Sequence, residues 1–151
     1  MPEPLFETVT PRLGLPLLFA GQAQKEGYVN EIATRIDSLL FLAIEGQADT
    51  PPTDPDDGTS WLIGSNPVGA WAGKAGHIAS FQAGNWLFSA PFDGMRLLDR
   101  SSGQEIRHIG QWTIPQRPAV PTGGATVDTE ARAAIAAIVA SLTDAGIVPA
   151  A

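Results

Sequence analysis

Apolar residues recur at helical spacing in two segments of the chain. The first is residues 30–45, where one residue in three or four is apolar and the apolar positions share one face of a helix. Asn30 is placed to cap this helix and Gly46 to end it. The stripe, which begins just before the cap, consists of Val29, Ile32, Ile36, Leu39, Leu40 and Ala43.

The second helical segment is residues 127–148, with Asp128 placed as its cap and Gly146 as its end. Its apolar positions step by four and three over about two heptads. They are Ala131, Ile135, Ile138, Leu142 and Ala145. An isolated helix of this length is marginal in water. We therefore expect it to assemble with copies of itself through Ile135, Ile138 and Leu142, with folding back on its own domain as the alternative.

Between the helices, residues 60–114 show the shorter apolar runs of β-strands. "HIASFQAGNWLFSA" places Gly84-Asn85 between two such runs, as a hairpin turn would. "QEIRHIGQWTI" alternates like one strand, with Ile106, His108 and Trp112 on one face. The predicted fold is α+β: an N-terminal arm and helix packed on a small antiparallel β-sandwich or partial barrel, and a C-terminal assembly helix after a Pro/Gly linker.

Four zones follow from this pattern. Residues 1–27 are interrupted by prolines and predict an extended docking arm, whose apolar side chains must be covered by its own domain or by a neighbouring protein. Residues 28–114 hold the helix and β domain, 115–126 the linker, and 127–148 the C-terminal helix. The arm's candidate assembly residues are Leu15, Leu17 and Phe19. A secretory signal is not expected, because acidic residues flank the apolar run and Pro16 interrupts it.

Composition narrows the function classes. The 151-residue chain is 44% hydrophobic, enough for a folded core, and the 16 Gly and 13 Pro favour short strands and loops. Its net charge of −7, without a cluster of Lys or Arg, argues against binding nucleic acid or an anionic membrane surface. Membrane insertion is not expected, because the apolar run near residue 13 is shorter than the roughly 20 residues that a spanning helix needs. The absence of cysteine excludes disulfides and thiolate chemistry.

Catalytic and metal-binding motifs match poorly. His77 and His108 are two histidines where a zinc site needs three or four ligands. "DPDDG" at 54–58 lacks the Gly and Glu positions of a calcium loop, and "GAWAGKAG" lacks the spacing of a phosphate loop. No "GxSxG" turn occurs, and no pair of carboxylates stands out for glycoside hydrolysis. We expect no catalytic residues, no metal and no cofactor, hence no enzyme.

Aromatic residues are the better candidates for ligand contact. Four tryptophans lie in or beside the strand region, where such rings usually fill the core. Trp71 differs from the other tryptophans, because it lies within a Gly/Ala-rich stretch between strands. We expect a ring at this position to be exposed and able to contact a sugar or a protein partner. The candidate ligand-binding residues are Trp71, Trp86, Trp112 and His77.

The residues also carry a family resemblance. "GQAQKE" (21–26), Asn30-Glu31 and the aspartate-leucine block 37–40 resemble the opening of an uncharacterised domain family of prophages and phage-like gene transfer agents. The downstream "PPTDPDDGTSWLIG" and the "EARAAI" helix are similar to later parts of such proteins. The resemblance implies a virion component found in head spikes and tail fibres, and it implies no catalytic residues.

The resulting hypothesis is a structural, homo-oligomeric component of a phage-like particle, a head spike or tail fibre base that supports attachment to host-surface polysaccharide. Its expected partners are copies of itself, a capsid or tail protein, a fibre protein and the polysaccharide. Its expected location is the particle, after assembly in the bacterial cytoplasm. The alternative is a stand-alone carbohydrate-binding module, and a glycan hydrolase is a third hypothesis.

Overall fold

A computed structural model describes residues 9–149, apart from 14, 16, 19–20 and 22–24. The chain divides into two compact units, residues 1–91 and 92–151. Among the described residues there are two α-helices and eight short strands, which form two four-stranded sheets that are not closed into a barrel. The predicted α+β class is therefore confirmed.

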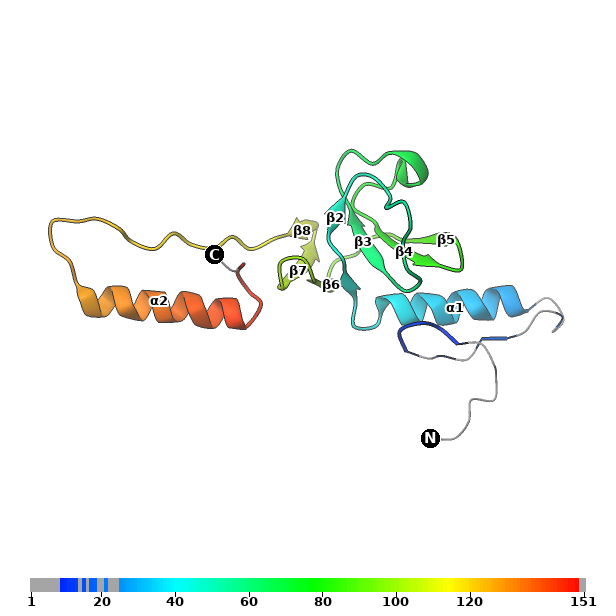
Figure 1. Cartoon of the computed structure of the whole chain (residues 1–151), viewed down its shortest axis with the longest axis horizontal. Helices are drawn as coiled ribbons and strands as arrows, with labels where there is room; N and C mark the ends of the chain where they lie inside the picture. The colour runs from blue at the N-terminus through cyan, green and yellow to red at the C-terminus, as the bar shows by residue number, and fades with distance from the viewer. Residues whose placement is uncertain (1–8, 14, 16, 19–20, 22–24, 150–151) are drawn as a thin grey trace, which may run out of the picture. The chain divides into compact units, whose positions relative to one another are not determined.

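The first unit contains helix α1 and a sheet in the order β2-β3-β4-β5, with α1 running along one side of that sheet (Figure 1). Strand β2 pairs with β3 in parallel, and the other two pairings are antiparallel. The elements are α1 (Glu26–Leu39), β1 (Ala43–Ile44), β2 (Gln47–Ala48), β3 (Ser60–Ile63), the 3₁₀ turn η1 (Gly69–Trp71), β4 (Ile78–Gln82) and β5 (Asn85–Ser89).

The core of this unit is aromatic. Trp71 is completely buried and packs with Ile63 and Ala79, because alternate residues of β3 and β4 face the same side of the sheet. Trp61 and Trp86 cover this cluster from the neighbouring strands. The sequence "SWLI" thus contributes to a packed core, as the short apolar runs predicted.

The β4–β5 hairpin turns at Ala83 and Gly84, one residue earlier than the predicted Gly84-Asn85 turn. Both residues have positive φ, 49° and 76°, as a two-residue type I′ turn requires. Gln82 and Asn85 consequently form the last strand pair, and the side chains of Gln82, Asn85 and Leu87 lie on the same face of the hairpin.

Helix α1 begins at Glu26, so the prediction that Asn30 caps it is wrong. Asn30 lies inside the helix, where its side-chain amide donates to the Leu18 carbonyl (3.0 Å) and its oxygen accepts from the Leu18 N–H (2.8 Å). The helix ends at Leu39, before the predicted stop at Gly46. Its buried residues are Thr34, Asp37 and Ser38. The polar side of α1 is therefore the side that meets the rest of the unit.

Two residues tie the N-terminal segment to the end of α1. The carboxylate of Asp37, 1% exposed, accepts from the Thr10 hydroxyl (2.8 Å) and from the backbone N–H groups of Arg12 and Leu13. The Arg12 guanidinium donates in turn to the carbonyls of Asp37 and Ser38, which are left without helical partners at the end of α1, and to the carbonyl of Phe41 just beyond the helix. This part of the predicted arm belongs to the folded unit.

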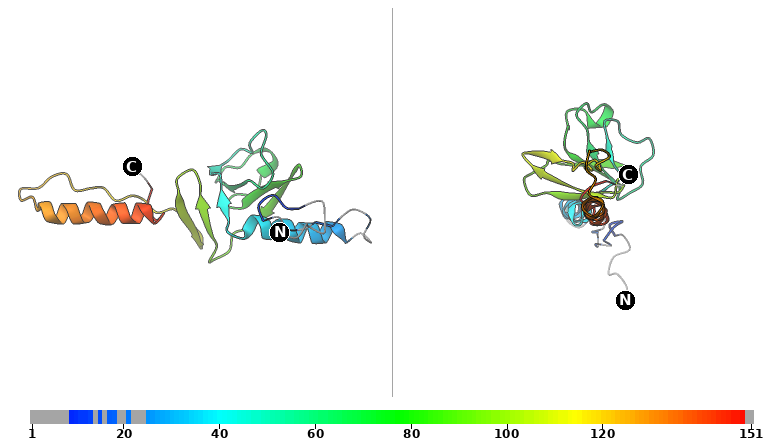
Figure 2. Two further views of the ribbon diagram at one scale, coloured as in Figure 1. Left: turned by 60° about the horizontal axis from the view of Figure 1, so that its bottom comes forward. Right: turned by 90° about the vertical axis from the view of Figure 1, so that its left-hand side faces the viewer.

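The second unit is a β-meander followed by helix α2 (Figure 2). The expected single strand from 104 to 114 is two strands, because the chain reverses at Gly110, whose φ is 67°. Burial alternates along the first of them, with Gln104, Ile106 and His108 inside. The elements are β6 (Arg96–Asp99), β7 (Gln104–Ile109), β8 (Gln111–Thr113) and α2 (Thr129–Asp144).

Helix α2 has the ends that the sequence predicts. The Asp128 carboxylate accepts from the Ala131 N–H (2.8 Å), and Gly146 follows the helix with φ of 70°. The Gly146 carbonyl accepts from the Glu105 N–H (2.8 Å), which fastens the end of α2 to β7. Residues 115–126 run beside α2 without regular secondary structure, and Arg132 donates to the carbonyls of Pro121 and Gly123.

Candidate functional site

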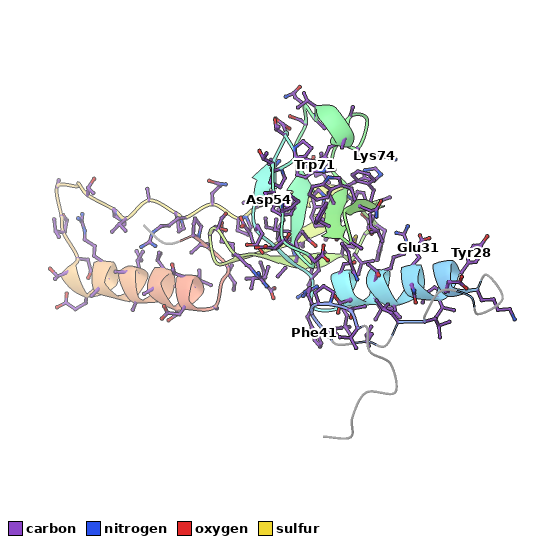
Figure 3. The ribbon with its side chains drawn as sticks, turned by 45° about the vertical axis from the view of Figure 1, so that its right-hand side comes forward. Tyr28, Glu31, Phe41, Asp54, Trp71 and Lys74 are labelled. Atoms are coloured by element: carbon purple, nitrogen blue, oxygen red, sulfur yellow. The ribbon has the colours of Figure 1, made fainter. Side chains whose placement is uncertain are left out.

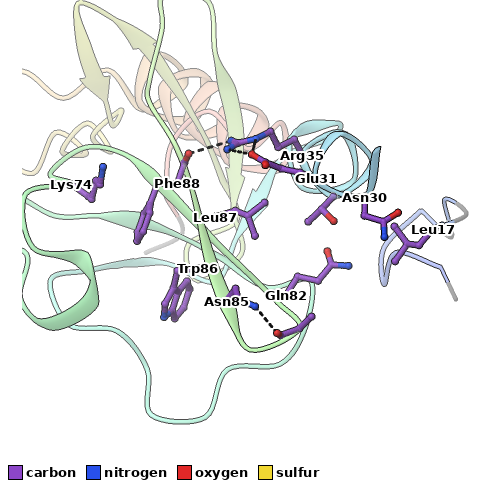
Figure 4. A pocket seen from close by; sticks show the side chains of 12 residues that line it. Leu17, Asn30, Glu31, Arg35, Lys74, Gln82, Asn85, Trp86, Leu87 and Phe88 are labelled. Carbon is purple, nitrogen blue, oxygen red and sulfur yellow. Dashed lines mark hydrogen bonds and ion pairs between the residues drawn. The ribbon is translucent and has the colours of Figure 1, made fainter. Parts of the chain in front are cut away.

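An open cleft lies in the first unit, between helix α1 and the β4–β5 hairpin (Figure 4). Its volume is about 640 Å³, within the range of small-molecule sites in proteins. The lining is mixed, with aromatic, amide, carboxylate and cationic side chains on two sides of the opening. Because the same unit contributes both walls, the geometry of the cleft is defined within that unit.

The α1 wall presents a charged pair. Glu31 and Arg35 are one helical turn apart, and the Glu31 Oε1 accepts from Arg35 Nη2 (2.7 Å) and Nε (2.9 Å). Arg35 Nη1 also donates to the Phe88 carbonyl on the edge strand β5 (3.3 Å). An exposed pair of this kind adds at most about 1 kcal/mol to stability. Its main effect is to orient the carboxylate and guanidinium at the rim of the cleft.

The hairpin wall presents amides and apolar surface. Gln82, Asn85 and Leu87 share the face of the hairpin that lines the cleft, and Leu87 lies between Arg35 and the body of β5 in Figure 4. The Asn85 amide donates to the Ala83 carbonyl (2.8 Å), which holds that side chain against the turn. This wall therefore combines hydrogen-bonding groups with an aliphatic contact.

Trp86 connects the cleft to the core. It is half-buried, lines the cleft, and meets the Trp71 ring edge-to-face with the centroids 5.1 Å apart. Nearby, Lys74 Nζ lies 5.5 Å from the centroid of the Phe88 ring, a cation–π distance. At the β5 edge, the cleft is therefore lined by the Trp86 indole and the Lys74 ammonium group.

Trp71 does not present its ring. The expectation of an exposed contact residue is wrong, because the 3₁₀ turn directs Trp71 into the sheet, where it packs on Trp61 and Trp86 with 0% exposure (Figure 3). The Gly/Ala-rich context that suggested exposure instead lets the backbone turn tightly, with positive φ at Gly69 and Gly73.

The other candidate ligand residues are not part of the cleft. His77 Nδ1 donates to the Ala75 carbonyl (3.2 Å), and His77 is absent from the cleft lining. Trp112 belongs to the second unit, where its ring meets His108 edge-to-face at 5.1 Å. The structure therefore brings together only Trp71 and Trp86 of the four candidates.

Sequence reasoning missed the polar residues of the cleft. Glu31 and Arg35 stand at i and i+4, a readable helix pair, but nothing local shows that a hairpin more than fifty residues later completes the wall. The amides of Gln82 and Asn85 flank the hairpin turn, where polar residues are usual, so their position alone carries no functional signal.

The candidate assembly residues have mixed surroundings. On α2, Ile135 is 39% exposed, Ile138 is 59% exposed and Leu142 is half-buried. Leu15 and Leu17 of the arm are half-buried, and Leu17 lines the cleft. Phe19 lies outside the described residues. Self-association through any of these residues stays a prediction.

The second unit holds the one histidine–carboxylate contact among the described residues. Asp93 Oδ1 lies 3.1 Å from His108 Nδ1 and accepts from the Gly110 N–H (2.6 Å). The Gly110 hydrogen bond is the largest cause that lowers the pKa of the Asp93 carboxyl below its ordinary value; desolvation opposes it, and the hydrogen bond and charge of His108 lower the pKa further. Since both partners fix the Gly110 reversal, the pair stabilises the β7–β8 turn.

Within the described part of the chain, no group of three or more His, Asp or Glu side chains is placed to hold a metal ion. In the same residues, no helix has the length and apolar character needed to cross a membrane. Neither observation identifies a chemical reaction.

The fold and the cleft together define a small α+β protein with an open cleft lined by polar and aromatic residues. Residues 29–113, more than half of the chain, match the family described as "Protein of unknown function (DUF2793)", and the chain belongs to this family. A comparison with curated proteins finds no match. The expected membership of an uncharacterised family is confirmed.

Proposed function

We propose that this protein is a non-enzymatic structural component of a phage-like particle, a head spike or tail fibre base, that supports attachment to host-surface polysaccharide. In this proposal it assembles with copies of itself and with a capsid or tail protein and a fibre protein, in the bacterial cytoplasm. The particle part rests on the sequence resemblance, above all on the "GQAQKE" block and the residues that follow it.

The cleft between α1 and the β4–β5 hairpin is the observation that carries the polysaccharide part. Sugars present hydroxyl groups around a ring whose C–H faces are apolar. The cleft matches both properties, because Glu31, Arg35 and Gln82 offer donors and acceptors beside the apolar surface of Leu87, and Trp86 adds apolar surface on the other face of β5. The cleft is open rather than enclosed, which suits a polymer longer than the cleft itself.

The charge of the cleft favours binding over hydrolysis. Glycoside hydrolysis ordinarily needs two carboxyl groups facing the scissile bond. Glu31 is the one carboxylate among the described lining residues, and it is already paired with Arg35. The hydrolase hypothesis is therefore the weaker one for this cleft.

A binding experiment tests the polysaccharide part. Purified surface polysaccharide of the bacterium that encodes the chain is titrated into the protein by calorimetry, using wild type, the double variant Glu31→Ala/Gln82→Ala, and Asp54→Ala as an exposed acidic control outside the cleft. We expect at least tenfold weaker binding for the double variant and unchanged binding for the control. No binding by wild type, or equal binding by all three, would contradict the proposal.

A stand-alone carbohydrate-binding module is the second candidate, because one unit supplies both walls of the cleft. This candidate predicts the same titration but no association with particles. Fractionation of particles on a density gradient, followed by detection of the chain, separates the two functions.

A further inference from the structure

Helix α1 turns its apolar side to solvent. Three of its aliphatic residues, and Leu40 directly after the helix, are between 40% and 59% exposed: Val29, Ile32, Ile36 and Leu40. Surface helices normally bury such a stripe and expose the polar one. An arrangement that does the reverse calls for a partner that the described residues of the chain do not supply.

The helix cannot bury this side by rotating, because its opposite side is held. Thr34, Asp37 and Ser38 are buried against the unit, Asn30 is hydrogen-bonded to both backbone groups of Leu18, and the Asp37 carboxylate holds residues 10–13. Each of these bonds joins α1 to the described part of its own unit. The outward direction of the apolar side is thus built into the fold.

The exposed side has the spacing of a coiled-coil seam. Val29, Ile32, Ile36 and Leu39 are separated by three, four and three residues, which places Val29 and Ile36 at a positions and Ile32 and Leu39 at d positions. The buried polar residues then fall at b, c and f, the positions that face away from a partner helix. Among the described residues, the unit covers the back of α1 and leaves this side exposed.

A strained residue extends the seam at its C-terminal end. Phe41 has φ of 53° and is 80% exposed, although bulky side chains avoid this conformation. The Arg12 guanidinium, which donates to the Phe41 carbonyl (2.8 Å), holds it there. Figure 3 shows Phe41 and Tyr28, also exposed, at opposite ends of α1. Backbone strain of this kind persists only where the surrounding structure holds it, and it is concentrated at functional sites.

We infer that this seam, defined as Val29, Ile32, Ile36, Leu39, Leu40 and Phe41, binds the same seam of a second copy of the chain. A hollow of about 360 Å³ lies on this side of α1 and is lined by Arg35, Ile36, Leu39 and Leu40. In a coiled coil, a side chain of the facing helix inserts between residues at such positions. An identical helix supplies such knobs as Ile32 and Ile36.

Charge supports a copy as the occupant. The chain carries a net charge of −7, so most contacts between copies bring like charges together. The seam carries no acidic residue, and Arg35 at its border is neutralised by Glu31 of the same helix (2.7 Å). Two copies can therefore meet along this face without electrostatic repulsion, whereas a basic partner gains nothing from it.

This inference deepens the proposed function, on which it rests only for the expectation of a homo-oligomer. It assigns assembly to α1 in addition to the α2 stripe that the sequence suggested. Its test needs neither particles nor polysaccharide. Failure of the seam therefore leaves the glycan titration unaffected, and failure of the titration leaves the seam unaffected.

Sedimentation velocity of the full chain from 1 to 100 µM measures the association. The variants are Ile32→Glu/Ile36→Glu on the seam and Ile109→Glu on β7, a control outside both expected assembly surfaces whose side chain is as exposed as that of Ile32. We expect wild type to associate and the control to associate over nearly the same concentration range. The double variant should need a protein concentration at least tenfold higher to associate. Circular dichroism checks that helix content is kept.

Disulfide trapping supplies a second readout in a chain that has no cysteine. Ile36→Cys, at an a position, should form a covalent dimer on mild oxidation. Gly27→Cys lies at an f position of the same helix with open space around its side chain, and it should stay monomeric. Monomeric wild type at 100 µM would overturn the inference, whether another segment of the chain covers the seam or nothing does. Association that survives the seam substitutions, or equal trapping of both cysteine variants, would overturn it too.

Discussion

Replacing Asp37 should release the N-terminal segment from helix α1. The carboxylate is 1% exposed and accepts three hydrogen bonds, from the Thr10 hydroxyl and from the N–H groups of Arg12 and Leu13. Hydrogen bonds to a charged group contribute roughly 1.5–3 kcal/mol each. The full sum is not lost in Asp37→Ala, because residues 10–13 can detach and hydrate their donors, and the cost of burying the charge is removed.

We expect Asp37→Ala to lower the free energy of unfolding by about 3 kcal/mol, which corresponds to roughly 10–20 °C in Tm for a unit of this size. Asp37→Asn keeps one acceptor oxygen and should lose less, about 1–2 kcal/mol. Asp57→Ala is the matched control, since the exposed Asp57 carboxylate accepts one backbone bond, from Ala83 (2.9 Å). It should change stability by less than about 1 kcal/mol.

Thermal unfolding followed by circular dichroism measures the stability, and amide hydrogen exchange at Arg12 and Leu13 measures the attachment. In wild type these two amides should exchange slowly, and in Asp37→Ala at the rate of an open segment. A Tm within 2 °C of wild type, together with unchanged exchange, would refute the reasoning that this carboxylate holds the segment.

Three further substitutions probe single features. Ala83→Gly should stabilise the first unit by about 1 kcal/mol in urea unfolding, because Ala83 occupies a positive φ of 49° that glycine adopts without strain; a loss of stability would contradict this. Trp71→Ala should cost about 3–5 kcal/mol, since the ring is fully buried among other aromatic residues, and a value under 1 kcal/mol would show that it is not core. The lowered pKa of Asp93 favours the folded state above the unfolded-state pKa of about 3.9, and this contribution is lost as the pH falls through the lower folded-state value. A pH series of Tm should therefore fall more steeply below pH 4 for wild type than for Asp93→Asn, and parallel curves would contradict the assignment.

The sequence predicted helix α2 well because its end signals are local. Asp128 caps it and Gly146 follows it, as expected, and neither needs a distant partner to do so. Strand alternation around Ile106 and His108 was predicted correctly for the same reason, since the period of two is a property of neighbouring residues.

The errors arise where tertiary contacts override local preference. Asn30 resembles a helix cap, but its amide is used by Leu18, twelve residues away. Periodicity showed which residues of α1 share a face. It did not show which face is buried, because that depends on the hydrogen bonds between Asp37 and residues that are distant in sequence. Trp71 was misplaced likewise, since only the assembled sheet reveals the space that its ring fills.

The candidate cleft was predictable only in part. Trp86 was named as a ligand residue from its type, and it does line the cleft. The polar residues beside it come from α1 and from the hairpin, and no residue spacing in the sequence predicts that these two elements face each other. The structure divides into two compact units, residues 1–91 and 92–151. The domain boundaries expected from the sequence are not tested by this division and stay predictions.

Immunogold labelling of purified particles tests the central proposal most directly. An antibody to this protein is applied to particles released from the bacterium that encodes it, and gold is located by electron microscopy. The proposal predicts gold at fixed points on the head or the tail. Unlabelled particles, with the protein left in the supernatant, would contradict a particle component and favour the stand-alone carbohydrate-binding module.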